Sequence, residues 1–529
     1  MSRTLYPPPA AAAIAREVSE WDFIVVGAGS AGCVVASRLS ENGRSRVLLL
    51  EAGGHDMRPW IHLPVGYART FTQAAVNWMY ESEPEPGLDG RRIYQPRGKV
   101  MGGSSSINAM VWVRGQPRDF DDWGPGWGWS DVEPWFRRAE AVVDVVSMEH
   151  GVHPLCETWL QTCDAMGYGR TGDFNRRLEG TGIYRNAMRG GTRLSAARAY
   201  LPHAVRRRAN LRIEKRAHAT RILFEGRRAV GVEYARGGRT IPARGGEIVL
   251  TAGAFNTPQL LQLSGIGPEA VLRAHGIGVL EDLPVGEGLQ DHLFTDISLR
   301  VSRPSLNREL TSRARLARHG LLYALQRRGP LSMGVNQAGG FLRTGGAPAP
   351  DMQVYFAPIS YRRPQPGEDG PIRLDPFAGV SLSAQPCRPT SRGRVVIASR
   401  DPFAPPLIRA NYLDTEEDRA AMLRGARLLR RMARTEPLET LVEEQVVPVG
   451  VGDDDEALLA DIRARASTVY HPVGTCALGR VTDREGRVRG VERVRVADAS
   501  LFASITSGNT NAPTTMAAEK IAAAILAAQ

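Results

Sequence analysis

Short apolar runs alternate with a helical segment near the start of the chain. Residues 23–26 read Phe-Ile-Val-Val and residues 47–50 read Val-Leu-Leu-Leu. Continuous aliphatic and β-branched runs of this length are typical of strands buried on both faces of a parallel sheet. Residues 33–39 lie between the two runs and have helical character. The pattern therefore predicts a strand, a helix and a second strand.

Glycines connect the first predicted strand to the helix. Gly27, Gly29 and Gly32 follow G-x-G-x-x-G spacing, and Glu51 ends the second strand. The first glycine permits a tight turn, the second lets the backbone approach a pyrophosphate, and the third lets helix and strand pack closely. An acid at the end of the second strand accepts hydrogen bonds from ribose hydroxyls. The spacing alone could mark an ordinary turn, but with both strands and the acid it predicts a dinucleotide site.

A second segment rich in small residues follows at 102–106, where glycines and serines precede the apolar run 109–113. Such a backbone passes very close to a flat or anionic group. A flexible linker is the alternative, but the flanking Val, Met and Trp residues argue against it. This segment predicts a second contact with the ligand.

The central part of the chain gives weaker patterns. Alternation over residues 221–251, with turns at the glycine pairs 237–238 and 245–246, predicts a β-meander. Thr257 and Pro258 predict the N-cap and first position of a helix that reaches Leu263. Residues 119–140, which contain four tryptophans, predict a helix and a loop at the surface.

Residues 300–460 contain many prolines and an arginine-rich segment at 311–328. Leu316, Leu321 and Leu325 have partly helical spacing within this segment. A basic amphipathic helix of this kind either lies on a membrane surface or presents a solvated face, and the sequence favours the solvated face. Residues 394–397 predict a strand.

Several recognisable motifs lie close together in the C-terminal part of the chain. Residues 470–475 read Tyr-His-Pro-Val-Gly-Thr, residues 494–500 follow, and residues 507–516 include Asn509 and Asn511. An alanine-rich helix near Pro513 ends the chain. Its N-terminal end would direct a positive dipole toward the site.

Composition narrows the function classes. The 529 residues include 67 basic and 56 acidic side chains, a formal net charge of +11. No basic helix is interleaved with stacking aromatics, so we expect no nucleic-acid partner. The five cysteines form no C-x-x-C pair, which argues against a disulfide framework and against a metal site.

The sequence predicts no transmembrane segment, because no apolar run approaches about 18 residues. Residues 1–20 lack the apolar core of a signal peptide and are interpreted as a tail. A cytoplasmic location is therefore the default expectation, with peripheral membrane contact left open by the arginine-rich segment.

These motifs together resemble the glucose–methanol–choline (GMC) family of flavin oxidoreductases, especially its choline dehydrogenase-like branch. The resemblance rests on residues 22–51, 97–108, 253–267 and 284–292 and on both C-terminal motifs. Two departures are Met101, where a smaller or branched residue is usual, and Gly288, where Asn is common.

The resemblance implies an α/β fold (α+β overall) with two domains. A Rossmann-like FAD-binding domain with a β-meander would comprise residues 21–150, 200–300 and 465–529. A substrate domain with an antiparallel sheet and helices would comprise residues 151–199 and 301–464.

The resemblance also implies where FAD contacts the chain. The expected cofactor residues are Gly27, Gly29, Ser30, Ala31, Gly32, Glu51, Ala52, Trp78, Arg97, Met101, Gly102, Gly103, Ser104, Asn108, Ala109, Met110, Val111, Ala252, Gly253, Asp498, Ala499, Asn511, Pro513 and Thr514. Some family members tether the flavin through a His where this chain has Ile107. We therefore expect non-covalent FAD.

Alcohol oxidation needs a base for the hydroxyl proton and an acceptor for the hydride, and flavin N5 is the acceptor. Among ten histidines, His471 matches the family's catalytic position, and histidine titrates near neutrality. Asn509 matches the second catalytic position, with Asn511 as the neighbouring candidate. Tyr470 and Gln337 are the expected substrate contacts.

The favoured function is oxidation of a primary alcohol to an aldehyde, with oxygen or a quinone as electron acceptor. Choline-oxidising relatives carry Glu where this chain has Gln337, which favours a neutral alcohol over choline. The alternatives are choline dehydrogenase proper, a flavin-containing hydroxynitrile lyase, and a protein that retains FAD without turnover.

Overall fold

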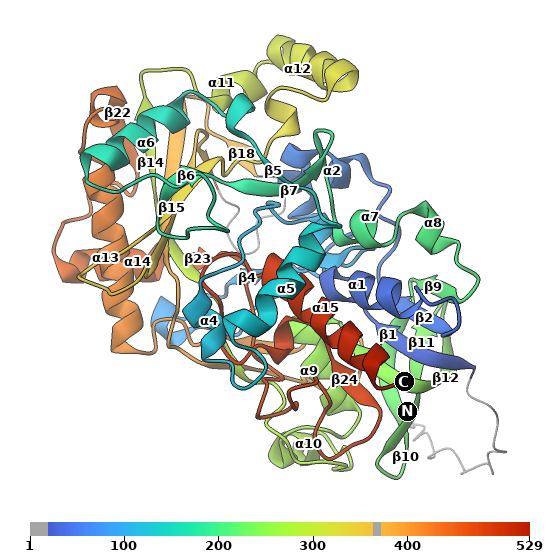
Figure 1. Cartoon of the computed structure of the whole chain (residues 1–529). Helices are drawn as coiled ribbons and strands as arrows, with labels where there is room; N and C mark the ends of the chain where they lie inside the picture. Colours follow the sequence, from blue (N-terminus) through green and yellow to red (C-terminus); the bar gives the residue numbers. More distant parts are fainter. Residues whose placement is uncertain (1–19, 363–371) are drawn as a thin grey trace, which may run out of the picture.

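Two large sheets stand at opposite sides of the molecule, with helices and loops between them (Figure 1). The computed structural model describes residues 20–362 and 372–529, so the predicted N-terminal tail lies almost entirely outside the described residues. None of the helices formed by these two stretches combines the length and apolar character that crossing a bilayer requires.

The first sheet has seven strands and contains the predicted strand–helix–strand unit. β1 (Trp21–Val26) and β2 (Val47–Glu51) pair in parallel, and α1 (Ser30–Leu39) connects them. The other strands are β9 (Leu211–Lys215), β10 (His218–Glu225), β11 (Arg228–Arg236), β12 (Arg239–Leu250) and β24 (Val494–Val496). Their order, β10-β11-β12-β1-β2-β9 with β24 beside β12, confirms the predicted α/β class and β-meander.

β12 joins the meander to the parallel sheet. It pairs antiparallel with β11 up to Arg244 and parallel with β1 from Gly245 onward. The predicted turn at the glycine pair 245–246 is therefore wrong. A Cβ at Gly245 would lie 2.7 Å from the Ile24 side chain, so glycine is needed where the strand changes partners.

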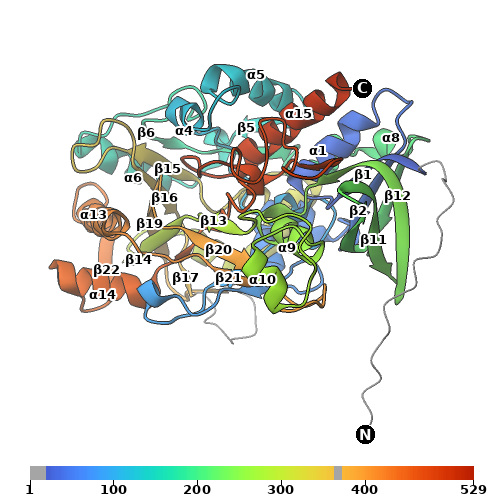
Figure 2. The ribbon, with the colours of Figure 1, turned by 90° about the horizontal axis from the view of Figure 1, so that it is seen from below.

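Helices from both ends of the chain meet on this sheet (Figure 2). α1 packs against α15 (Asn511–Ala527), and α15 packs against α5 (Trp129–Glu140). The fully buried Glu519 accepts from Arg38 at 2.8 and 2.9 Å and from the Tyr200 hydroxyl at 2.9 Å. These contacts fix the C-terminal helix on the helix that follows the glycine turn.

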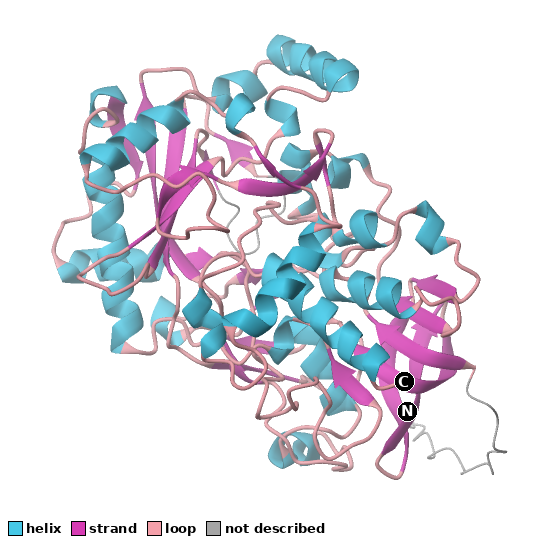
Figure 3. Ribbon diagram, viewed as in Figure 1, coloured by secondary structure: helices cyan, strands magenta, loops and turns pink. Residues whose placement is uncertain are grey.

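The second sheet is antiparallel, as expected for the substrate domain, and has helices on its flanks (Figure 3). Its strand order is β22 (Val442–Val447), β14 (Leu293–Val301), β19 (Gly379–Pro386), β16 (Met352–Ala357), β15 (Ala338–Leu342) and β6 (Gly180–Ile183), with β23 (Ser467–Thr468) beside β14. α13 (Glu416–Ala433) contacts β14 and β19, and α6 (Leu155–Ala165) contacts β6 and β16. β14 begins at Leu293, within the segment 200–300 that was assigned to the FAD-binding domain.

Smaller elements surround these sheets. They are α2 (Pro59–His62), α3 (Tyr67–Thr70), β3 (Tyr80–Glu81), β4 (Tyr94–Gln95), α4 (Pro117–Asp121), β5 (Val145–Ser147), β7 (Arg185–Arg189), β8 (Thr192–Arg193), α7 (Ala196–Tyr200), α8 (His203–Arg206), α10 (Glu269–Ala274), β13 (Glu287–Leu289), α11 (Leu306–Thr311), α12 (Arg313–Gln326), β17 (Tyr361–Arg362), β18 (Arg373–Leu374), β20 (Gly393–Val396), β21 (Leu407–Arg409) and α14 (Asp455–Arg465).

The helix predicted to begin at Thr257 begins earlier. α9 spans Gly253–Leu263, so Thr257 and Pro258 lie inside it and the predicted N-cap is wrong. Pro258 has no N–H for the carbonyl of Ala254, which instead accepts a hydrogen bond from the Thr475 hydroxyl at 2.8 Å. In the tryptophan-rich segment, α5 forms the predicted helix, and Trp123 and Trp127 are buried.

Candidate active site

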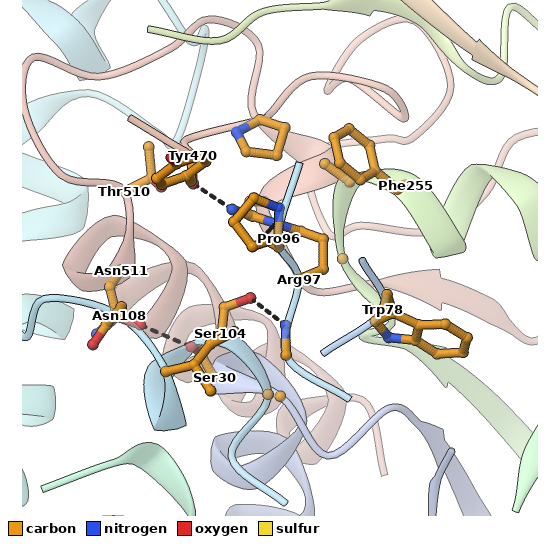
Figure 4. Close-up of a pocket in the computed structure, with 18 of the residues that line it drawn as sticks. Ser30, Trp78, Pro96, Arg97, Ser104, Asn108, Phe255, Tyr470, Thr510 and Asn511 are labelled. Atoms are coloured by element: carbon orange, nitrogen blue, oxygen red, sulfur yellow. Dashed lines mark hydrogen bonds between the residues drawn. The ribbon is translucent and has the colours of Figure 1, made fainter. Parts of the chain in front are cut away.

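One cavity extends from the glycine turn after β1 to His471 and Asn509. Figure 4 shows part of its lining, including Ser30, Arg97 and Tyr470. The predicted residues that line it are Gly27, Gly29, Ser30, Ala31, Glu51, Ala52, Trp78, Arg97, Gly103, Ser104, Asn108, Ala109, Met110, Val111, Ala252, Gly253, Tyr470, His471, Asp498, Ala499, Asn509, Asn511 and Thr514. Gly32, Met101, Gly102, Pro513 and Gln337 are not among the lining residues. Segments far apart in the sequence therefore share one cavity.

The glycine turn is crowded on one side and open on the other. A Cβ at Gly103 would lie 2.6 Å from the Gly29 Cα atom, so the loop at 102–106 passes directly over the turn. At Gly29 itself a Cβ would meet only the Thr251 carbonyl oxygen, at 3.8 Å. The backbone amides beside Gly29 are thus accessible to an anionic group, as a dinucleotide pyrophosphate requires.

Two helix N-termini meet at this turn. Ser30, the first residue of α1, donates a hydrogen bond to Asn511 Oδ1 at 2.7 Å, and Asn511 is the first residue of α15 (Figure 4). Pro513 lies in the first turn of α15, and the first turn of this helix borders the cavity through Asn511 and Thr514. Both helices place the positive ends of their dipoles toward a bound anion.

Glu51 is buried where β2 meets the cavity. Its carboxylate accepts from the backbone N–H groups of Ala28 at 2.9 Å and Gly53 at 2.7 Å. Burial raises the pKa of Glu51 to about 7, although these two hydrogen bonds oppose the shift. A carboxyl group held in this way accepts hydrogen bonds from hydroxyl groups of a ligand.

Asp498 connects the C-terminal motif to the N-terminus of α9. Its Oδ2 atom accepts from the Gly253 N–H and from the Thr257 hydroxyl, both at 2.7 Å. Burial raises the pKa of this carboxyl group. Thr257 therefore bonds to Asp498 from within the helix instead of capping it.

His471 lies in a chain of hydrogen bonds that defines its protonation. His292 Nε2 lies 2.9 Å from the carbonyl oxygen of Cys387, which can only accept, so this nitrogen carries the proton. His292 Nδ1 then accepts from His471 Nδ1–H at 3.0 Å. His471 Nε2 is left unprotonated and faces the amide nitrogen of Asn509 at 3.1 Å. This tautomer is assigned from the network.

Electrostatics keep His471 neutral. Burial lowers the pKa of His471 well below 6.5, and the nearby His292 and Arg97 side chains lower it further. Asp291 fixes the position of the pair by accepting from the backbone N–H groups of His471 at 2.7 Å and His292 at 2.9 Å. The site thus holds an imidazole whose Nε2 atom is unprotonated at neutral pH and accepts from the Asn509 amide.

The orientation of the Asn509 amide is set from the opposite side. Gln353 Nε2 and the Tyr355 hydroxyl each lie 3.5 Å from Asn509 Oδ1. Both groups can donate, so the amide oxygen belongs on their side and the amide nitrogen on the side of His471. Gln353 and Tyr355 lie on β16, which contains no recognisable motif, so residue patterns did not single them out.

Arg97 holds the loop that carries His471. Its Nη2 atom donates to the carbonyl oxygen of Tyr470 at 2.7 Å (Figure 4). Burial lowers the pKa of Arg97 to about 10. Tyr470 has φ of +70°, an unfavourable backbone conformation directly before His471. Arg97 is thus part of the protein framework that positions the imidazole.

Gln337 does not line the cavity, contrary to the expected substrate contact. Its Oε1 atom accepts from the backbone N–H of His153 at 2.8 Å and lies 3.6 Å from Cys156 Sγ. The preceding residue, Asn336, lines the cavity instead. Gln337 connects the beginning of β15 to the start of α6.

Several aromatic side chains contribute to the cavity wall. They include Tyr67, Phe71, Phe294, Tyr355, Tyr361 and Tyr470. Among the described lining residues, carboxylates come only from Glu51 and Asp498, which lie beside the glycine turn and α9. The wall is therefore suited to a neutral ligand with an apolar part.

Comparisons with known proteins agree with this architecture. The family model "GMC oxidoreductase" matches residues 21–294 with its N-terminal part and residues 389–518 with its C-terminal part. The "Alcohol dehydrogenase [acceptor]" of Pseudomonas putida is 38% identical, with 96% of each chain covered. The "Oxygen-dependent choline dehydrogenase" of Photobacterium profundum is 37% identical, covering 96% of this chain and 93% of the relative.

A solved structure is similar over the same length. The crystal structure of pyridoxine 4-oxidase from Mesorbium loti superposes with a TM-score of 0.85 at 28% identity. The match covers 96% of this chain and 99% of that protein. The fold as a whole thus has a counterpart in a protein of known structure.

Proposed function

The chain belongs to the GMC oxidoreductase family, and from this membership we propose that it oxidises a primary alcohol to an aldehyde with FAD as cofactor. The observation that carries the proposal is the unprotonated Nε2 of His471 beside the Asn509 amide, at the far end of the dinucleotide cavity. Base and amide donor meet where an alcohol hydroxyl would lie.

The cavity residues fit FAD. The open side of the turn at Gly29 would receive the pyrophosphate, with the N-termini of α1 and α15 directed at it. Glu51 would accept from ribose hydroxyls, and the loop from Gly103 to Val111 would pass along the ring system. Bound FAD supplies the acceptor for the hydride that leaves the alcohol carbon.

The protein's own residues manage the proton. His471 Nε2 takes the hydroxyl proton, so an N–H bond forms as the O–H bond breaks. His471 Nδ1–H remains bonded to His292, which keeps the imidazole in position while it is charged. The Asn509 amide donates to the developing alkoxide, and the N-terminus of α15 stabilises negative charge at the same end of the cavity.

The substrate test distinguishes a neutral alcohol from choline. Desolvating a quaternary ammonium is costly without a carboxylate to compensate its charge, and the described lining residues near His471 include no acid. We expect benzyl alcohol or 1-butanol to bleach the flavin absorbance under anaerobic conditions with higher kcat/KM than choline. Better turnover of choline would contradict this specificity.

The same experiment tests the other candidate functions. A hydroxynitrile lyase would cleave a cyanohydrin without bleaching the flavin, and a protein that only retains FAD would do neither. Admitting air after reduction tests the acceptor. Rapid return of the yellow colour would identify oxygen, whereas return only with an added quinone would identify a dehydrogenase.

FAD is expected to be bound without a covalent link. Ile107 lines the cavity where a tethering side chain would need a nucleophile, and an isoleucine has none. All five cysteines are buried, and burial raises the pKa of Cys33, the one in the α1 helix, so its thiolate is disfavoured. Acid precipitation should leave the yellow colour in the supernatant. A yellow pellet after washing would contradict the prediction.

A further inference from the structure

α12 is the most weakly packed long helix of the second half of the chain. It follows α11 and spans Arg313–Gln326, and none of its residues is buried. Figure 1 shows it at the top edge of the molecule, away from both large sheets. Its side chains are therefore available to a partner outside the fold.

One face of α12 is apolar and exposed. Leu321 is 62% exposed and Leu325 is 73% exposed. Three exposed alanines share that face through i, i+3, i+7, i+10 and i+11 spacing with the leucines: Ala314, Ala317 and Ala324. Keeping two leucine side chains in water is unfavourable, so this face gains stability in a less polar environment.

Unpaired arginines flank the apolar face. Arg313, Arg318 and Arg328 are exposed and have no carboxylate partner within residues 20–362 and 372–529. Between residues 303 and 328 the sequence contains seven arginines and one acid, Glu309. Glu309 is already occupied by Arg315 and His319, both at 2.7 Å. The surface around the leucines is thus strongly positive.

From this arrangement we propose that α12 docks the protein on the anionic surface of a phospholipid bilayer. Leu321 and Leu325 enter the boundary between headgroups and acyl chains. The flanking arginines extend toward lipid phosphates while their methylene stems cover apolar surface. Anionic lipid headgroups supply negative charge for these arginines, which have no carboxylate partner among the described residues.

Charge also distinguishes this partner from a second copy of the chain. In a two-fold interface through α12 the same arginines would face one another, because such an interface joins identical patches. Like charges placed opposite one another disfavour association. A bilayer with anionic headgroups satisfies both the leucines and the arginines.

Docking would place the substrate side of the cavity near the lipid. Leu310 of α11 packs on the same small core as Tyr67 and Tyr361, and both tyrosines line the cavity. The turn after α12, Pro330–Ser332, contacts the turn Pro64–Gly66 directly before Tyr67. If the proposed function holds, an alcohol dissolved in the bilayer would reach this wall over a short path.

Vesicle sedimentation of the holoenzyme tests the proposal. Vesicles of phosphatidylcholine are compared with vesicles of equal parts phosphatidylcholine and phosphatidylglycerol. We expect at least about tenfold stronger binding to the anionic vesicles. Leu321→Gln/Leu325→Gln should lower that binding about tenfold or more, with unchanged flavin content and unchanged turnover of a water-soluble alcohol. The control Val449→Gln removes a side chain of similar exposure, 74%, and should bind as wild type.

A second comparison shows whether binding depends on the arginines around α12 or only on the net charge of the protein. Arg313→Gln/Arg318→Gln/Arg328→Gln should weaken binding, whereas Arg44→Gln/Arg239→Gln/Arg489→Gln, three exposed arginines elsewhere, should not. Equal loss in both triple variants would overturn the proposal. So would equal binding to both vesicle types, or a dimer in solution that the leucine double variant dissociates.

Discussion

Replacing His471 by alanine is expected to slow flavin reduction by alcohol about 10²–10⁴-fold, the range that a general base contributes. The structure gives the reason in the hydrogen-bond chain from Cys387 through His292 to His471. That chain leaves Nε2 of His471 free to accept a proton, and burial keeps the imidazole neutral by lowering its pKa. Anaerobic stopped-flow absorbance measures the rate directly.

The control must show that the variant still folds around FAD. His203 is exposed on α8, and His203→Ala should reduce its flavin at the wild-type rate. His471→Ala should keep its full flavin content, because the residues around the glycine turn remain in place. Reduction of His471→Ala at the wild-type rate would remove the imidazole from the proposed mechanism.

Residues that act through local geometry could be predicted from the sequence. The turn from Gly27 to Gly32 and the acid Glu51 were expected together, because each role depends on neighbours along one strand–helix–strand unit. The structure places that unit as expected, with Gly29 open to the cavity and Glu51 on its wall. Residues close in sequence were enough to predict this unit, because β1 and β2 pair directly with each other.

Side-chain direction was harder to predict than position. Gln337 precedes β15, so a shift by one residue decides whether a side chain faces the cavity or α6. Asn336 lines the cavity, whereas Gln337 contacts the segment before α6. The helix start predicted at Thr257 and Pro258 was wrong for a related reason. The hydroxyl of Thr475, far along the chain, donates to the Ala254 carbonyl that Pro258 cannot reach, so α9 accommodates the proline.

Contacts between the two sheets had no signal in the sequence. Gln353 and Tyr355 orient the Asn509 amide from β16, at a sequence separation of more than 150 residues. His292 stood within a motif that supported the family resemblance, yet its role became apparent only beside His471. Pairings of this kind depend on how the second sheet packs against the first, which residue spacing does not encode.

Replacing Gly32 by alanine is expected to prevent stable FAD binding. A Cβ atom at this position would lie 1.8 Å from the carbonyl oxygen of Gly27 and 2.7 Å from Thr251 Oγ1. Neither atom can move easily, because the Thr251 hydroxyl bonds to the carbonyls of Gly27 at 2.7 Å and Val26 at 2.8 Å. The methyl group therefore displaces α1 from β1 and moves its N-terminus away from the pyrophosphate.

The expected cost is at least that of overpacking a core, about 1–3 kcal/mol, together with at least about a tenfold loss in FAD affinity. Gly54→Ala is the matched control, because a Cβ there meets no atom within 4 Å although Gly54 lies just beyond Glu51. Flavin absorbance per protein and titration of the apoprotein with FAD measure the effect. A Gly32→Ala protein with full flavin content and wild-type Tm would show that the turn relaxes without moving α1, and that close packing at this glycine is not what holds the phosphates.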